Sequence, residues 1–581
     1  MKTQFHHLAF LAAFGLQVVN ALPANQYFAG DGSAFNAAKW GNSAGGPFTA
    51  NFTNGNVAYF STVNGTGSGS VGITVAGIVA TENHTHSSPS GTLLNQGNAV
   101  VPVTVAAGKV FDLSTAAITT SATAGYIKNG AGALVWAGGS FGGGFTLNDG
   151  FLISRGVNAM GVGPLVINGG AIGGTASRDF SGKFSSVTIG GDFQFGVLSS
   201  SVAVASSTAN LTFDADFNLG SALRTITIGG NGTYTMTNVF TGTGGAGVVV
   251  TNAPSATGTI ALQKTNNYPG PTVLAGGNVT VNAFATFGDG TGVLRFAGGV
   301  LGVAGTRSIS SDFINNPIEL TASSTIRSTG GTDNTSRIVV FSSGSVTTLD
   351  GTLTLQNGAA SATNNVFEVR LLGGGFVFSR PINLDSGVGT GNFARLYLGG
   401  SNTAAPQTIS GVISGNGQIR RSAVTASTAG TSILTAANTY SGGTDVIAGT
   451  LLVNNTSGSG TGSGTVTVSS TGILGGTGSI GGPVTITSPG TLAPGSNGIG
   501  TLTVANSVSL GGVTRMELNR INAQTADKLV RSGGALAFGG TLTITNVGPT
   551  PVNGDVFDLF DADSFSGSFS TINLPPGGAA H

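Results

Sequence analysis

Tyr440-Ser441-Gly442-Gly443-Thr444, followed by Gly449-Thr450-Leu451-Leu452-Val453, is the stretch of sequence that decides the fold. It occurs twice more upstream in degenerate form, with the same spacing from an aromatic residue to a glycine and then to an apolar strand. One copy reads Phe141-Gly142-Gly143-Gly144-Phe145 with Gly150, and the other reads Tyr268-Pro269-Gly270-Pro271-Thr272 with Gly277. Three ungapped copies are difficult to obtain from a composition rich in Gly, Thr and Asn alone.

Short alternating strands separated by glycine or asparagine turns, at a spacing of roughly twenty residues, are typical of a β-solenoid. We expect the glycines to lie where the backbone turns with a positive φ. We expect the aromatic residue of each copy to pack in a row along one face. With strands about 4.8 Å apart along the axis, the repeats predict a rod on the order of 100 Å long. The residues that define the repeat are Tyr440, Gly442, Gly443, Thr444, Gly449, Leu451, Tyr268, Gly277, Phe141 and Gly150.

The composition of the chain narrows the classes of partner and fold. The 581 residues include 99 glycines and no cysteine, 8% are charged, and the formal net charge is zero. Without a basic surplus we expect no nucleic-acid or anionic-lipid partner. Long apolar windows past residue 30 are broken by Gly, Asn, Thr or Ser, so the sequence predicts no membrane span in the mature chain. Apolar runs at period two, such as 225–228 and 541–544, favour an all-β fold over disorder.

The amino terminus has the pattern of a secretory signal. Lys2 with two histidines forms a weakly basic start, an apolar segment runs from Leu8 to Val19, and Val19-Asn20-Ala21 offers small residues for cleavage. We expect cleavage after Ala21, with Ala24 as the second choice. In an exported chain without cysteine, stability has to come from stacked strands rather than disulfides. The predicted organisation is a signal peptide at 1–21, an N-terminal cap or lead-in β module at 22–126, a β-helix repeat region at 127–500 and a C-terminal β capping segment at 501–581.

The stretch 434–444 with Gly449-Thr450-Leu451 resembles the autotransporter-associated β-strand repeat of bacterial passenger proteins. The segment 516–574, with Gly554-Asp555-Val556-Phe557, resembles the ending that commonly follows such repeats. The resemblance implies a right-handed parallel β-helix that is exported to the cell surface or the medium. Passenger regions of that family are followed by a translocator barrel, and no such segment precedes His581. We therefore expect that the sequence is truncated, or that the protein is released or held non-covalently.

Residues that could carry chemistry are sparse. The densest acidic group is Asp555, Asp558, Asp561 and Asp563, which we interpret as a solvated turn rather than a catalytic or calcium site. Other aspartates adjoin glycine or threonine, as turn residues do; these are Asp31, Asp149, Asp289 and Asp445.

Glu82-Asn83-His84-Thr85-His86 is the one metal-like cluster, because alternate histidines on a strand share a face and suit zinc or copper. No third ligand is evident, so we expect an exposed loop there. No nucleophile elbow accompanies the histidines, and no basic residue follows Gly458-Ser459-Gly460 to make a phosphate loop. The sequence thus predicts no catalytic residue, no cofactor and no metal.

These observations lead to a hypothesis of an exported, non-enzymatic protein of the cell surface or extracellular matrix. Its long β-helix would display Thr, Ser and Asn for adhesion or shielding, with surface polysaccharide or another cell-surface component as partner. Two alternatives remain open: a polysaccharide-active β-helix enzyme, whose site would need clustered carboxylates on adjacent coils, and a carbohydrate-binding protein without turnover.

Overall fold

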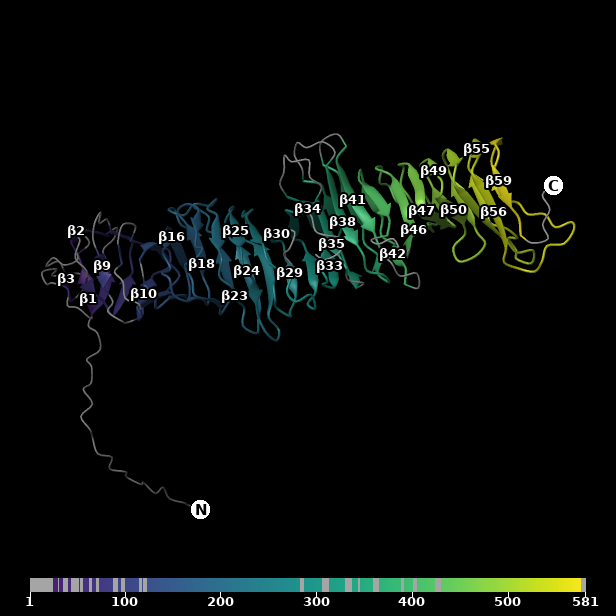
Figure 1. Cartoon of the computed structure of the whole chain (residues 1–581). Helices are drawn as coiled ribbons and strands as arrows, with labels where there is room; N and C mark the ends of the chain where they lie inside the picture. The colour runs from purple at the N-terminus through teal and green to yellow at the C-terminus, as the bar shows by residue number, and fades with distance from the viewer. Residues whose placement is uncertain are drawn as a thin grey trace, which may run out of the picture.

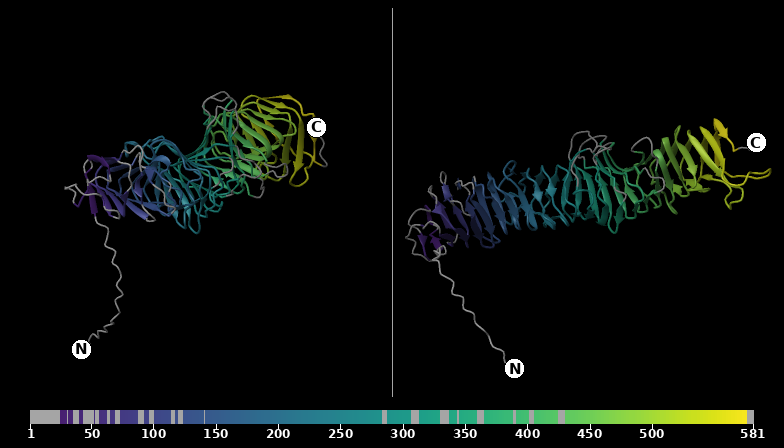
Figure 2. Two further views of the ribbon diagram at one scale, coloured as in Figure 1. Left: turned by 60° about the vertical axis from the view of Figure 1, so that its left-hand side comes forward. Right: turned by 60° about the horizontal axis from the view of Figure 1, so that its bottom comes forward.

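The protein is a long parallel β-helix in which every regular element of the described residues is a strand (Figure 1). This computed structural model describes residues 25–29, 31–34, 40–42, 52, 56–61, 65–68, 73–86, 92–95, 100–113, 117–118, 123–139, 141–282, 287–305, 313–329, 337–342, 345–358, 365–387, 391–400, 405–423 and 430–575. The predicted signal segment lies outside these residues. The elongated shape expected from the repeats is confirmed, and Figure 2 shows it from two further sides.

Long parallel sheets form the walls of the helix, and each coil adds one strand to each wall. In the N-terminal half, one sheet runs from β3 (Trp40–Gly41) and β1 (Asn25–Phe28) to β26 (Phe240–Thr241). A second runs from β2 (Asp31–Ala34) to β36 (Val346–Thr348), and a third runs from β19 (Arg178–Asp179) to β43 (Ile413–Gly415). A small sheet holds β6 (Ile73–Thr74), β9 (Thr92–Asn95) and β12 (Ala117–Ile118).

The C-terminal half has a different arrangement of walls. Its largest sheet runs from β35 (Arg337–Phe341) to β59 (Thr571–Asn573), and it contains two strand ladders that join in the long, bent strands β46 (Thr444–Val453) and β47 (Val466–Gly476). A four-stranded sheet of β48 (Ser479–Ile480), β51 (Thr501–Val504), β54 (Lys528–Arg531) and β57 (Phe560–Asp561) covers the remaining side. The axis of the rod steps sideways in Figure 1 where this large sheet begins.

The register shows why the repeat is imperfect in sequence. Leu152 lies opposite Leu134 of the coil before it, whereas Ile228 lies opposite Phe195, from which a much longer stretch of chain separates it. The strands therefore stack in register while the turns between them vary in length. The even spacing of roughly twenty residues that the sequence suggests therefore holds for some coils and not for others. The extra residues of the longer coils lie in turns outside the ladders and leave the strand pairing unchanged.

Alternation along each strand creates the core. In β10 (Val100–Val105), Val101, Val103 and Val105 are buried while Val100 points outward. Successive side chains of a strand point to opposite faces, so a period of two in the sequence places one set inside. One cluster of buried residues extends from Phe28 to Leu542, and each large aliphatic side chain in it contributes roughly 1.5–3 kcal/mol of burial free energy.

Buried asparagines close turns inside the helix. Asn316 Nδ2 donates hydrogen bonds of 2.7 Å to the carbonyls of Phe287 and Gly292. In a later coil, Asn438 Oδ1 accepts a bond of 2.8 Å from the Ile413 N–H. A primary amide both donates and accepts, so it satisfies turn backbone groups that no ladder pairs.

The two ends differ. At the N-terminal end, β3 pairs antiparallel with β1, and Trp40 packs against Phe28 with ring centroids 5.0 Å apart. At the C-terminal end, β58 (Ser564–Gly567) and β59 are exposed, and Phe565 stacks on Phe538 with centroids 5.5 Å apart. Phe565 and Ile572 are thus apolar side chains that the last described strands leave exposed.

The described ladders continue through both expected module boundaries. Strand β10 pairs with β13 (Gly125–Asn129), which spans the boundary at 126–127. Strand β51, which begins at Thr501, pairs with β48 and β54. The modules at 22–126, 127–500 and 501–581 are therefore not marked by a break in strand pairing, and their division remains a prediction from sequence.

Candidate functional site

The repeat aromatics are buried where a coil enters a strand. Tyr440 Oη lies 2.6 Å from Thr444 Oγ1, and Tyr268 Oη lies 2.6 Å from Thr272 Oγ1, so the two copies make the same hydrogen bond. Burial raises the pKa of both tyrosines well above the ordinary value. In the remaining copy Phe141 holds the aromatic position and is also buried. These residues form an internal structural contact and lie away from the surface.

A buried cation lies beneath the corner glycine in two copies. Gly449 has a φ of 73°, and the Arg421 guanidinium of the preceding coil lies directly under it. Gly150 has a φ of 72°, and Lys128 Nζ of the preceding coil occupies the same place. The register confirms the equivalence, since Arg421 pairs with Val446 and Lys128 pairs with Leu147, two residues into the strand in both copies. Both cations are fully buried.

These cations satisfy backbone carbonyls at the corner. Lys128 Nζ donates to the carbonyls of Asn129, Gly130 and Asp149 at 2.8, 2.6 and 3.1 Å. Arg421 donates to four carbonyls, which belong to Leu398, Gly400, Ser422 and Gly430. Burial lowers the pKa of Lys128 to about 8 and that of Arg421 to about 10.

The copy at 268–281 departs from this plan. Val250 pairs with Leu274, the position that Arg421 and Lys128 hold in the other copies, so an apolar side chain fills the corner. The positive φ lies at Gly276, at 82°, and not at Gly277. Gly277 instead allows a close approach, because an added Cβ would lie 2.6 Å from the carbonyl carbon of Val250.

The other repeat glycines serve two different purposes: one allows a turn with a positive φ, and the other allows two backbone segments to lie close together. Gly443 has a φ of 95°, as the sequence predicts for a turn. Gly442 lacks a positive φ, and an added Cβ there would lie 2.6 Å from the Gly417 carbonyl carbon. Leu451, in the second half of β46, is fully buried.

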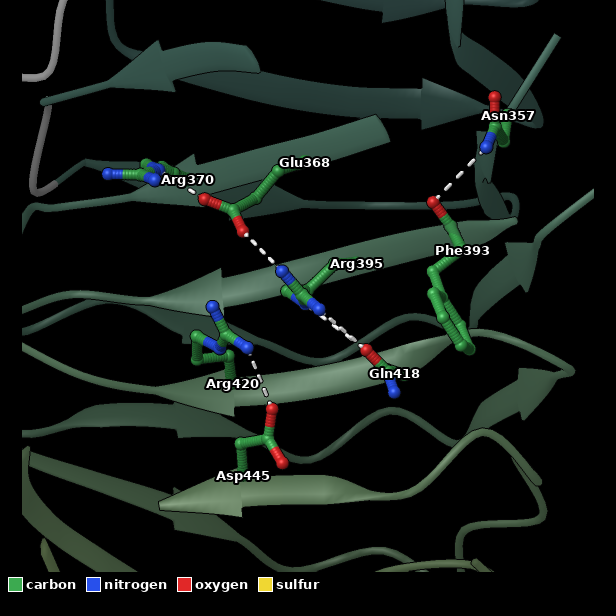
Figure 3. A network of polar contacts seen from close by, with 8 residues as sticks. All are labelled: Asn357, Glu368, Arg370, Phe393, Arg395, Gln418, Arg420 and Asp445. Atoms are coloured by element: carbon green, nitrogen blue, oxygen red, sulfur yellow. Dashed lines mark hydrogen bonds and ion pairs between the residues drawn. The ribbon is translucent and has the colours of Figure 1, made fainter. Parts of the chain in front are cut away.

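A charged network crosses the face of the large C-terminal sheet that points away from the core (Figure 3). Glu368 in β38 (Val366–Leu371) accepts from Arg370 and, at 3.1 Å, from Arg395 in β41 (Phe393–Leu398). Arg395 also donates to Gln418 at 2.8 Å, and Arg420 pairs with Asp445 at 2.9 Å.

Most of this network is withdrawn from solvent. The side chain of Glu368 is 3% exposed and that of Arg395 is 11% exposed. Arg370 also lies over the ring of Tyr397, with its guanidinium carbon 4.5 Å from the centroid. Burial lowers the pKa of Arg395, with the nearby Arg420 adding to the effect. The network ties four neighbouring strands together, and we assign it a structural role.

A groove on the surface of the C-terminal half is the best candidate for a functional site. Its volume is about 520 Å³, and it is lined by strand residues from successive coils together with residues of the connecting turns. Residues that line it include Thr431, Thr450, Leu452, Ile473, Gly475, Ala493, Asn497, Arg515, Glu517 and Asp527. Concave sites of roughly 300–1,000 Å³ are the usual size of ligand-binding clefts.

Asp527 anchors the wall of this groove. Its Oδ1 accepts a hydrogen bond of 2.9 Å from the Gly500 N–H, and its Oδ2 accepts one of 2.8 Å from the Glu517 N–H. The residue is 1% exposed. Burial raises the pKa of Asp527 to about 6 even though both N–H groups stabilise the charged form.

The groove could not be found from the sequence, because its residues are far apart in the chain and only the coil register brings them together. Thr431 pairs with Thr450, and Thr450 pairs with Ile473, on three consecutive strands. The one local signal is charge, because the segment that contains Glu517 and Asp527 also holds Arg515, Arg520 and Lys528 in a chain of which only 8% is charged.

The segment 82–86, for which the sequence predicts an exposed loop, ends in a strand. His84 begins β8 (His84–His86), is buried, and packs between aromatic rings, with centroids 4.5 Å from Phe60 and 5.7 Å from Phe111. The side chain of His86 lies outside the described residues. Within the part of the chain that the structure describes, no group of three or more His, Cys, Asp or Glu is placed to hold a metal ion.

The acidic C-terminal group pairs with the preceding coil. Asp555 binds Arg520 at 2.8 Å, and Lys528 Nζ lies 2.7 Å from Asp558 and 3.3 Å from Asp561. Asp563 accepts from the Gly534 N–H at 2.7 Å.

The aspartates that the sequence assigns to turns have different outcomes. Asp149 and Asp289 accept bonds from nearby backbone N–H groups, as turn residues do. Asp445 lies within β46, and Asp31 is the first residue of β2, so the turn prediction is wrong for both. Strand β46 begins at Thr444, directly after the turn glycines, so Asp445 is already paired. Its partners are β44 (Gln418–Arg421) on one side and β47 on the other.

Comparison of the chain with protein-family models, with curated proteins and with solved structures gave no match. The resemblance to the autotransporter-associated repeat therefore remains a prediction. Among the residues that the structure describes, no helix is long and apolar enough to cross a membrane.

Proposed function

We propose that the protein is an exported, non-enzymatic β-helix that works at the cell surface or in the extracellular matrix as an adhesive or display scaffold. The observation that carries this proposal is the alignment of small hydroxyl side chains on the outer face. Thr467 pairs with Thr485, and Thr485 pairs with Ser509, on consecutive coils. A second row places Thr431 beside Thr450.

Such rows suit contact with a hydrated surface polymer. Hydroxyl groups both donate and accept, and the fixed spacing of about 4.8 Å between coils repeats the same group along the rod. Many weak contacts on one rigid body add up through effective concentration, so adhesion does not require one tight site. The signal pattern and the resemblance to passenger repeats support an extracellular location.

The proposal is tested by locating and then altering the protein. We expect the full-length chain, expressed in a bacterial host, to be recovered from the cell surface or the medium with its N-terminus at Leu22, or at Asn25 if the second cleavage site is used. Cells or beads that carry it should adhere to immobilised surface polysaccharide, and the combined change Thr467→Val, Thr485→Val and Ser509→Ala should weaken adherence. Retention of Met1 in the exported protein, or undiminished adherence of the triple variant, contradicts the proposal.

A polysaccharide-active enzyme is the competing class, and the same preparation separates the two. We expect pectin, alginate and xylan to remain intact during incubation with the purified protein. Release of unsaturated or reducing ends above buffer, abolished by Asp350→Asn or Asp385→Asn in the repeat region, overturns the non-enzymatic proposal. In the structure, Asp350 accepts from the Gly351 N–H at 2.7 Å, and Asp385 accepts from Gln356 at 2.9 Å.

A further inference from the structure

We propose that the groove beside Asp527 binds an uncharged oligosaccharide chain that lies along the helix axis. This inference rests on the proposed adhesive function, for which it names a place and a class of ligand. The groove has a volume of about 520 Å³ and is built entirely from described residues of the C-terminal half.

The floor of the groove crosses several coils. Leu452 pairs with Gly475, and Gly475 pairs with Ala493, so a glycine without a side chain lies between two aliphatic residues. Beside this row, Thr450 pairs with Ile473. At about 4.8 Å per coil, the strands from β45 (Thr431–Leu434) to β53 (Val513–Leu518) span roughly 20 Å, which favours an extended ligand over a compact one.

The chemistry of the lining suits a sugar chain. Aliphatic surface on Leu452, Ile473 and Ala493 matches the C–H faces of sugar rings, and the hydroxyls of Thr431 and Thr450 match their edges. Apolar lining with a few placed polar groups is the usual composition of a ligand cleft.

The charges at one end of the groove argue against an acidic polymer. Arg515 and Glu517 line the groove, and the side chains of these two residues make no hydrogen bond or ion pair with another described residue. With Asp527 ionised, the three groups sum to a charge of about −1, which disfavours uronate chains and leaves an uncharged chain unaffected. Both oxygens of Asp527 already accept backbone N–H bonds, so this residue acts as a wall and Glu517 and Arg515 remain available to a ligand.

A peptide fits the groove less well than a glycan. The backbone of β46 is already paired on both sides, with β45 and with β47, so the floor presents side chains and no free strand edge. An extended peptide laid there would bury N–H and C=O groups without partners, and each such group costs roughly 1–3 kcal/mol.

Titration calorimetry on the full chain tests the proposal with defined probes. We expect saturable 1:1 binding of at least one of cellohexaose, xylohexaose and mannohexaose, and weaker binding of hexagalacturonate. Thr450→Lys places a long side chain in the groove and should lower affinity at least about tenfold. Thr503→Lys is the matched control, because Thr503 is an outward threonine of β51 that lies neither in the groove nor in the hydroxyl row proposed for adhesion. It should change affinity by less than about twofold.

Failure of the groove and failure of the adhesive function give different results. No binding by any of the three uncharged hexasaccharides, tighter binding of hexagalacturonate, or unchanged affinity in Thr450→Lys overturns the groove proposal, even where the protein still adheres to surfaces. Hexasaccharide binding that Thr450→Lys abolishes supports the groove, even where protein-coated beads fail to adhere. Melting temperatures of both lysine variants within a few degrees of the parent show that a loss of binding is not a loss of folding.

Discussion

Replacing Gly449 by alanine tests the corner of the repeat most directly. Gly449 has a φ of 73°, a conformation that costs an L-residue roughly 1–2 kcal/mol. The added Cβ would also lie 2.8 Å from Cζ of Arg421 and 2.7 Å from the Gly430 carbonyl oxygen. Both distances are shorter than van der Waals contact, so one of these groups has to move.

Arg421 is poorly able to move, because it is fully buried and bonded to four carbonyls. A hydrogen bond to a charged group contributes roughly 1.5–3 kcal/mol, so losing one of them adds that amount to the backbone term. We therefore expect Gly449→Ala to destabilise its coil by about 2.5–5 kcal/mol.

Gly276 provides the matched control at the corresponding corner of another copy. Its φ is 82°, yet an added Cβ there would meet no atom within 4 Å. Gly276→Ala should therefore cost only the backbone term of about 1–2 kcal/mol. Thr450→Val, which exchanges one β-branched residue for another beside Gly449, should cost less still.

Amide hydrogen exchange of the affected strands measures these local stabilities, since repeat proteins open locally. A double-mutant cycle with Arg421→Met isolates the collision, because Gly449→Ala should become milder, by at least about 1 kcal/mol, once the guanidinium is absent. Equal losses for Gly449→Ala and Gly276→Ala, or additive effects in the cycle, would refute the assignment of a buried cation beneath the corner.

The remaining predictions concern buried charges. Burial lowers the pKa of Lys128 to about 8, so between about pH 8 and 10 the unfolded chain holds more protons than the folded one. Thermal stability should therefore rise with pH over this range. Lys128→Met should remove the share of the rise that the titration of Lys128 causes. Burial raises the pKa of Asp527 to about 6, so between about pH 4 and 6 the folded chain holds more protons than the unfolded one. This contribution to stability is complete below about pH 4 and is lost as the pH rises through 6. Melting curves from about pH 4 to 6 should therefore show a fall in stability that Asp527→Asn flattens. Glu368→Gln leaves Arg370 and Arg395 without their shared carboxylate and should cost about 3–5 kcal/mol in exchange measurements, whereas Glu319→Gln, which breaks the more exposed pair with Arg295, should cost less than about 1 kcal/mol. A loss at Glu319 as large as that at Glu368 would contradict the burial argument.

The architecture follows from local sequence because a solenoid is built from local rules. The spacing from Tyr440 to Gly449 predicts a strand entry and a corner, and both occur at those residues. The sequence did not predict that Arg421 points inward, because a charged residue in an alternating strand is expected outside. Its burial depends on carbonyls contributed by Leu398, Gly400 and Gly430, which only the stacked coils bring together.

The candidate groove was less predictable than the fold for the same reason. Thr450, Glu517 and Asp527 belong to different coils, and nothing in their local sequence marks them as neighbours. Turn length also obscures the register, since short and long coils produce equivalent pairings, as Leu134 with Leu152 and Phe195 with Ile228 show. The alternation of buried and exposed side chains along a strand does not depend on turn length. The set of side chains that neighbouring coils bring together on the surface does, because it depends on the exact strand pairing.

The direction of strand pairing has a mechanical consequence. Hydrogen bonds in the ladders run along the rod from coil to coil, whereas the chain itself runs around it. A protease that cuts an outer turn therefore breaks one covalent link and leaves the ladders on both sides in place. A molecule nicked at several such turns should keep its length and its surface, with the fragments separating only in denaturant.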